Sequence, residues 1–174
     1  MKRLPPLLVL ASAFMLTGCS TPLTVAKDSS RFAEALGIST NDVLFLSYGN
    51  FDKSPKGPKP TFCQNHVVVL ATPSLLHIIH EKVSKNTEPK RISLKYSDMQ
   101  SIARKTQGFH SQIHLESGNY IILLDIVPNK VTGNRAGSKT LFDLITAKGV
   151  RVVEAKQWYD FKGAGGMAPI PLGF

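Results

Sequence analysis

Closely spaced histidines are the residues whose type and spacing most directly suggest chemistry. His77, His80 and Glu81 form the pattern H-x-x-H-E. Metal-binding histidines on a helix usually lie four residues apart, as in H-E-x-x-H, and residues three apart on a strand point to opposite faces. The surrounding stretch, SLLHIIHEKV, has apolar spacing that allows either a strand or a helix. Because a strand is favoured, we expect no metal here, and a metal-dependent hydrolase using these three residues is kept as an alternative hypothesis.

The other residue types that commonly carry catalysis form no recognisable arrangement. His110 and His114 lie four residues apart, but the alternation around them predicts a strand. The sequence contains neither the nucleophile elbow G-x-S-x-G nor a phosphate-binding Walker loop, and its carboxylates are scattered. We therefore predict no catalytic residues and no cofactor.

A second candidate site is a basic, proline-rich segment, DKSPKGPKP. Lys53, Lys56 and Lys59 recur every three residues, and prolines stiffen the backbone between them. In an extended, polyproline-like segment, a three-residue period places side chains along one edge. We expect a loop whose lysines contact an anionic lipid or glycan, with a simple solvated loop as the alternative.

Cys19 is the candidate residue with the most specific sequence context. Lys2 and Arg3 precede an apolar run over residues 4–16, which is shorter than the roughly 20 residues needed to span a bilayer as a helix. A positive start, an apolar stretch and small residues before a cleavage point are typical of an export signal. The sequence therefore predicts a signal peptide over residues 1–18.

The end of this segment, Leu16-Thr17-Gly18-Cys19, resembles the lipobox of bacterial lipoproteins. The resemblance implies cleavage before Cys19, a diacylglycerol thioether on its sulfur and acylation of the new amino terminus. Two or more acyl chains suffice for stable membrane attachment. In this family Ser20 at the next position implies an outer-membrane address. With Cys19 lipidated, Cys63 has no partner for a disulfide within the chain, and we expect it to be buried and inert.

Apolar periodicity predicts two helices that flank a run of about six or seven antiparallel strands. Residues 28–37 read as a short helix with Ser29 or Ser30 as its N-cap and Gly37 at its end. Residues 138–149 read as an amphipathic helix capped by Ser138 or Thr140. The strands are expected in DVLFLSYGNF, in HVVVLATP, in RISLKYSDM with QSIARKT continuing it, and in a hairpin, SQIHLESGNYIILLDIV.

Three of these stretches, RISLKYSDMQSIARK, SQIHLESGNYIILLDIV and TLFDLITAKG, resemble the pleckstrin-homology-like superfold, especially its GRAM branch. The expected fold class is mainly β with a C-terminal amphipathic helix (α+β), as a small antiparallel barrel or bent sheet. We expect the domain over residues 38–150, a lipidated tether and short helix over 19–37, and a C-terminal extension with a flexible Gly/Pro-rich tail over 151–174. In this superfold the loop between the first two strands binds lipids in some members, and Lys53, Lys56 and Lys59 occupy that place.

The overall charge and the export signal narrow the class of function. The formal net charge of +9 favours anionic partners. The signal peptide and the lack of an aromatic and basic platform argue against nucleic acid. We predict a non-catalytic binding or scaffold component of the bacterial cell envelope. It would be anchored to the outer membrane through Cys19, face the periplasm and bind an envelope protein.

Overall fold

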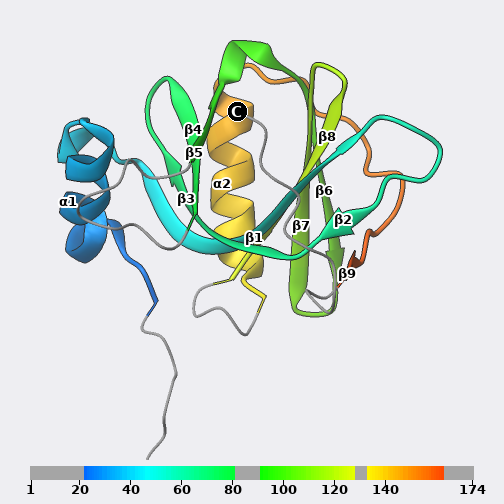
Figure 1. Cartoon of the computed structure of the whole chain (residues 1–174), viewed down its shortest axis with the longest axis horizontal. Coiled ribbons are helices and arrows are strands. Elements are labelled where there is room, and N and C mark those ends of the chain that lie inside the picture. Colours follow the sequence, from blue (N-terminus) through cyan, green and yellow to red (C-terminus); the bar gives the residue numbers. More distant parts are fainter. Residues whose placement is uncertain (1–21, 81–90, 128–132, 163–174) are drawn as a thin grey trace, which may run out of the picture.

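The computed structural model describes residues 22–80, 91–127 and 133–162, which form a curled antiparallel sheet with two α-helices (Figure 1). This arrangement confirms the expected mainly β fold built on a bent antiparallel sheet. The elements in chain order are α1 (Val25–Leu36), the 3-10 helix η1 (Thr40–Asp42), β1 (Phe45–Pro55), β2 (Phe62–Cys63), β3 (Asn65–Ala71), β4 (Leu75–His80), β5 (Arg91–Lys95), the 3-10 helix η2 (Tyr96–Asp98), β6 (Met99–Gln107), β7 (His110–Ser117), β8 (Tyr120–Ile126), α2 (Arg135–Ala147) and β9 (Phe161–Lys162).

The long strand β1 organises the sheet. Seven strands lie in the order β5-β4-β3-β1-β8-β7-β6, and every neighbouring pair is antiparallel. The first part of β1 pairs with β3 and its later part pairs with β8. Gly49 lies in the overlap, where an added Cβ would come within 3.1 Å of a Val69 methyl carbon and 3.2 Å of the Asp125 carbonyl oxygen. Glycine at this position therefore permits the close approach that joins the two halves.

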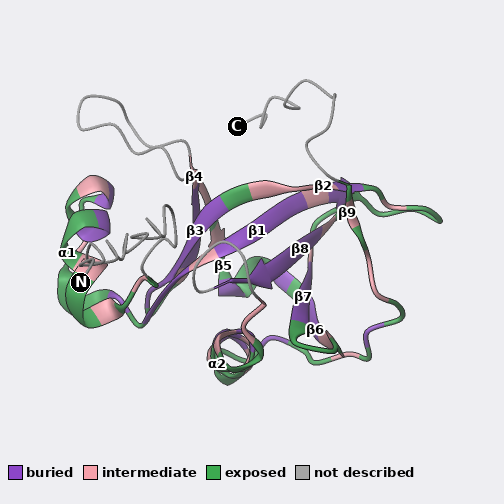
Figure 2. Cartoon of the chain, turned by 90° about the horizontal axis from the view of Figure 1, so that it is seen from below, coloured by how far each residue is buried: buried purple, intermediate pink, exposed green. Residues whose placement is uncertain are grey.

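The concave face of the sheet is apolar and holds the main core, which α2 covers. Ile113 and Leu115 alternate along β7 and face this core, and Leu141 and Ile145 come from α2; all four are fully buried. Figure 2 shows α2 lying in the opening of the curled sheet, away from α1. The apolar side of α2 is the one that the sequence indicates.

The start of α2 differs from the predicted one. Its N-cap is Asn134, whose side chain accepts a hydrogen bond from the Gly137 amide at 2.8 Å. Ser138 lies inside the helix, fully buried, and its hydroxyl donates to the Ser111 carbonyl at 2.7 Å. The hydroxyl that looked like a cap therefore fastens the helix to β7.

Helix α1 packs on the convex face of the sheet, and its start also differs from the prediction. Its N-cap is Thr24 rather than Ser29 or Ser30, whereas Gly37 ends it in the left-handed conformation, with φ of 65°, as expected. Phe32 and Leu36 are buried, with Ala33, against a second apolar cluster from the sheet: Val43, Leu46, Val68, Leu70 and Ile79. The folded unit therefore begins before residue 38.

The last described segment, residues 150–162, is an extended stretch that we call the strap. It makes a single parallel bridge to β6, between Val152 and Ile102, and its end forms β9, which pairs in parallel with β2. The strap is therefore an extension packed on the sheet rather than a further strand of it. The folded unit therefore continues past residue 150.

The stretch expected as one strand over RISLKYSDM and QSIARKT is two strands, which form opposite edges of the sheet. The break is η2, where the buried Tyr96 hydroxyl donates to the carbonyl oxygens of Thr72 at 3.0 Å and Leu75 at 3.2 Å. Burial raises the pKa of Tyr96 to about 12, so the hydroxyl stays a donor. At this contact the chain passes from β5, at one edge of the curled sheet, to β6, at the other edge. Neither α1 nor α2, nor any other helix of the described ranges, is long and apolar enough to cross a membrane.

Candidate functional site

Both histidines of the pattern lie on β4, and the strand does not bring them together. His77 is buried with its Nδ1 2.9 Å from the Ser93 hydroxyl, while His80 lies three residues along the same strand. Burial, and to a lesser extent the charge of Arg91, lowers the pKa of His77. Glu81 lies outside the described residues. Among those that are described, no three His, Cys, Asp or Glu side chains are grouped so that they could hold a metal.

The three lysines do not lie along one edge of an extended loop, as their spacing suggested. Lys53 was expected in a loop but belongs to β1, because the pairing with β8 continues to Pro55. Its ammonium lies 5.2 Å from the centre of the Tyr120 ring. Lys56 forms an ion pair of 3.0 Å with Glu116, whereas Lys59 is exposed. Two of the three cations thus have partners within the chain, and a ligand for this segment stays a prediction.

The structure describes only one of the two cysteines. Cys19 lies outside the described residues, so its lipidation stays a prediction. Cys63 is a free, half-buried thiol on β2. Its backbone amide donates to Asp52 at 2.5 Å, and the Lys53 amide donates to the other oxygen of this carboxylate at 2.8 Å. Burial raises the pKa of Asp52, against the lowering effect of these two hydrogen bonds.

A further candidate site lies on the convex face, where the strap passes over the second half of the sheet. The strap is attached to β6 by two backbone hydrogen bonds of 2.9 Å, between Ile102 and the residues Arg151 and Val153. Farther along, the Gln112 side chain makes two hydrogen bonds to the backbone of Tyr159. Its nitrogen donates to the Tyr159 carbonyl at 2.6 Å, and its oxygen accepts from the Tyr159 N–H at 3.2 Å. One glutamine on β7 thus fixes the position of a segment 47 residues away.

Aromatic contacts strengthen this second attachment. The Tyr159 ring lies 5.0 Å from the centre of Phe62, edge to face, and 5.2 Å from the His114 ring. Burial, and then the charge of Lys105, lowers the pKa of His114 to about 4. The imidazole is therefore neutral at neutral pH.

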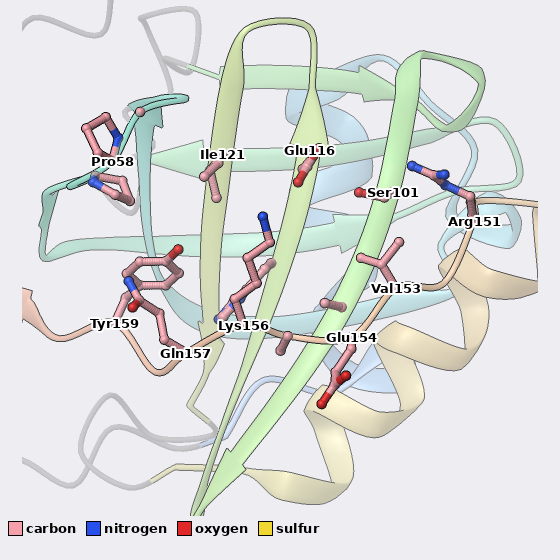
Figure 3. A pocket seen from close by; sticks show the side chains of 15 residues that line it. Pro58, Ser101, Glu116, Ile121, Arg151, Val153, Glu154, Lys156, Gln157 and Tyr159 are labelled. Carbon is pink, nitrogen blue, oxygen red and sulfur yellow. The ribbon is translucent and has the colours of Figure 1, made fainter.

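Between the two attachment points, the strap and the sheet enclose a cavity of about 500 Å³, which we call the strap cavity. Figure 3 shows its lining from β6, β7, β8 and the strap, with Lys156 and Glu116 projecting into the same space. The residues that line it include cations, carboxylates and neutral polar groups: Ser101, His114, Glu116, Arg151, Glu154, Lys156 and Gln157.

The strap cavity is lined by polar groups and by charged groups of both signs. Ser101 and His114 both line it, but among the hydrogen bonds of the described residues none joins them. A serine needs an adjacent base to become a nucleophile. Charges of both signs beside an extended backbone suit a polar peptide segment better than a small apolar ligand.

A smaller cavity of about 260 Å³, which we call the polar cavity, lies beyond Tyr159. It opens between β1, β7, β8 and the end of the strap. The lining side chains that matter for its chemistry are Asn50, Gln64, His110, Asp125, Trp158 and Asp160.

Sequence reasoning did not find either cavity. The available signal was the aromatic cluster Trp158-Tyr159 after the second helix, in a stretch whose pattern fits neither a helix nor a regular strand. The other half of the site, Gln112 and His114, lay on a predicted strand whose polar residues looked like a solvated face. Only the folded chain shows that these two segments meet.

Comparisons with known proteins give only remote likeness. No protein-family model and no curated protein matches the chain. Among solved structures, it is similar to the C-terminal domain of an unknown protein from Leishmania infantum, with 12% identity, a TM-score of 0.41, and coverage of 67% of this chain and 96% of that one. It is also similar to the hSac2 domain of human phosphoinositide phosphatase Sac2, with 12% identity, a TM-score of 0.42, and coverage of 80% and 95%.

Proposed function

We propose that this chain is a lipid-anchored, non-catalytic binding component of a bacterial cell envelope, in which the strap cavity holds a segment of an envelope protein. The observation that carries the proposal is the strap cavity itself, with its volume of about 500 Å³ and its lining of both charge signs. Preformed concave sites of this size are where proteins usually bind ligands. The lipobox-like Leu16-Thr17-Gly18-Cys19 supports the anchor, and Ser20 supports an outer-membrane address facing the periplasm.

A short connection between anchor and domain supports an envelope partner. Five residues lie between Cys19 and Val25, the first residue of α1, so the six Cα–Cα steps of this connection can span at most roughly 20 Å. Because α1 is packed on the sheet, it does not lengthen the connection. A lipidated Cys19 would therefore hold the folded domain close to the membrane by its α1 end, where the domain meets proteins of the same membrane or of its surface.

We also propose that the half-barrel is a variant of the pleckstrin-homology-like superfold. The support is its strand order, with β1 between two three-stranded meanders, and the helix α2 that follows the last strand of the second meander. Anionic lipid or glycan binding through Lys53, Lys56 and Lys59 has less support, because Lys56 is paired with Glu116. A hydrolase using His77, His80 and Glu81 has none from β4, which separates the two histidines.

Metabolic labelling with an alkyne-bearing palmitate tests the anchor. We expect the wild-type chain to take up the label and to sediment with membranes, and Cys19→Ala to lose both properties. Cys63→Ala is the matched control, because it removes the only other thiol and should keep both. Label that persists in Cys19→Ala would refute the anchor.

Site-specific photocrosslinking in intact cells tests the cavity. A photoreactive amino acid is placed at Lys156 or Pro58, which line the strap cavity, or at Lys139, an exposed residue of α2. We expect the same crosslinked protein from both cavity positions and not from the control. Ser101→Trp, which fills the cavity from β6, should abolish the product. Equal products from all three positions, or products that survive the filled cavity, would overturn the proposal.

A further inference from the structure

The polar cavity contains a buried carboxylate whose hydrogen-bonding capacity is only half used. The Asp125 side chain is 8% exposed, and its Oδ2 lies 3.4 Å from the Nδ1 atom of His110. Its Oδ1 is fully buried and has no hydrogen-bond partner among the described residues. A buried polar atom left without a partner costs about 1–3 kcal/mol. An acceptor with this cost is expected where a donor from outside the chain completes the site.

The surroundings of Asp125 indicate the sign of the missing group. The chain as a whole carries a formal charge of +9, yet the described lining of this cavity contains two carboxyl groups, Asp125 and Asp160, and neither lysine nor arginine. Asp160 is exposed on the strap and lies at the mouth. Burial raises the pKa of Asp125, and the neighbouring His110 opposes this shift. A cation bound here would offset the desolvation of the carboxylate.

Neutral groups add further acceptors and an aromatic wall. Gln64 donates from its nitrogen to the Asn50 side-chain oxygen at 3.2 Å, which leaves the Gln64 oxygen available as an acceptor. The Trp158 ring stands edge to face with His110, with ring centres 6.5 Å apart. Indole is the side chain that attracts cations most strongly through its ring face.

A metal ion fits this arrangement less well than an organic cation. A metal site needs several oxygen or nitrogen ligands around one point, and no group of three suitable side chains is found in the described ranges. A primary ammonium needs only two or three acceptors on one side and tolerates an apolar wall along its alkyl stem. The cavity volume of about 260 Å³ accommodates an alkylammonium the size of a lysine side chain.

We propose that the polar cavity binds a primary ammonium group on an alkyl stem, with Asp125 as its buried acceptor, Asp160 at the mouth and Trp158 along the stem. The ammonium comes either from a lysine of another protein or from a small diamine, since both present the same group. The site is separate from the strap cavity and does not depend on the proposed envelope role.

Trp158 makes the site testable, because it is the only tryptophan of the chain. The full-length protein in detergent is titrated with 1,5-diaminopentane, with acetyl-Gly-Lys-Gly-amide, and with acetyl-Gly-norleucine-Gly-amide, which has the stem without the ammonium. We expect a saturable change of Trp158 fluorescence with the first two probes or with one of them, and none with norleucine. Tighter binding of the peptide indicates a protein lysine, and binding of the diamine alone indicates a small amine.

Substitutions then identify the acceptors. Asp125→Asn should weaken binding at least tenfold, and Asp160→Asn should weaken it several-fold. Asp143→Asn is the control, because it removes one negative charge from an exposed position on α2. If Asp125→Asn does not fold, the exposed Asp160→Asn decides the question. The proposal is overturned by an equal response to the norleucine peptide, by no response to either amine, or by unchanged affinity in the carboxylate variants.

Discussion

Replacing Gln112 by methionine should release the strap without unfolding the sheet. Gln112→Met keeps a side chain of similar length at a position that is 1% exposed, but it removes both hydrogen bonds to the Tyr159 backbone. A hydrogen bond contributes about 1 kcal/mol net, so the docked strap should lose about 2 kcal/mol relative to the detached one. Since 1.4 kcal/mol corresponds to a factor of ten, the detached population should rise roughly 30-fold.

Hydrogen exchange followed by mass spectrometry measures this change directly. Amides of the strap should exchange roughly 30-fold faster in Gln112→Met, whereas those of β7 and β8, which lie in continuous ladders, should keep their rates. Gln100→Met is the matched control, since Gln100 lies on neighbouring β6 and accepts from Lys56, not from the strap. Unchanged exchange in the strap would refute the assigned role of Gln112, and faster exchange across the whole sheet would refute the idea that the strap detaches on its own.

Three further substitutions test other parts of the fold. Because the pKa of His114 is lowered to about 4 in the folded state, the unfolded chain binds the extra proton first, so stability is full above about pH 6.5 and falls as pH drops toward 4. The contribution of His114 to this loss should reach about 3 kcal/mol, and His114→Gln should remove that contribution in urea denaturation, whereas the lowered pKa of His77 keeps a loss of the same sign. Gly133→Ala should cost about 1–3 kcal/mol, because the new Cβ would lie 2.6 Å from the His110 ring. Phe32→Ala should weaken the docking of α1 on the sheet by about 3–5 kcal/mol, which hydrogen exchange of the helix amides would measure.

Each of these has a control close by. His66→Gln removes an exposed histidine and should leave the pH dependence in place. Gly57→Ala adds a Cβ where no heavy atom lies within 4 Å, so its stability should equal that of the wild type. Arg31→Ala changes the exposed neighbour of Phe32 and should leave α1 docked. A variant and its control that behave alike would contradict the contact on which the prediction rests.

The parts of the fold that depend on local sequence were predictable. The hairpin between β7 and β8 turns at Gly118, whose φ is 54°, and Gly37 ends α1, because both positions need a backbone conformation that glycine adopts at low cost. The apolar faces of α2 and β7 follow from spacing alone. Helix starts were less predictable, since Thr24 and Asn134 compete with several nearby hydroxyl side chains.

The parts that depend on distant residues were not predictable. Three prolines within ten residues indicated a loop for Lys53, but seven register pairs with β8 keep the chain extended as far as Pro55. The strap is held by one side chain on β7, by a single bridge to β6 and by the two-residue pairing of β9 with β2, and these contacts leave no periodic pattern in its own sequence. The cavities formed between the strap and the sheet are therefore products of tertiary structure.

Along β1, the side chains on the convex face change from apolar to polar. This change distinguishes the part of the face that stabilises the fold from the part that offers a binding surface. Alternate residues of β1 face this side, and they run from Leu46, which packs under α1, to Asn50, Asp52 and Ser54 in the half of the sheet that the strap covers. All four are buried. Burying a polar group stabilises a fold less than burying an apolar one, even when it is hydrogen-bonded. The gain in stability from burying apolar side chains is enough to explain the composition of the half under α1. The polar half, with its two cavities, needs a further reason, and ligand binding supplies one.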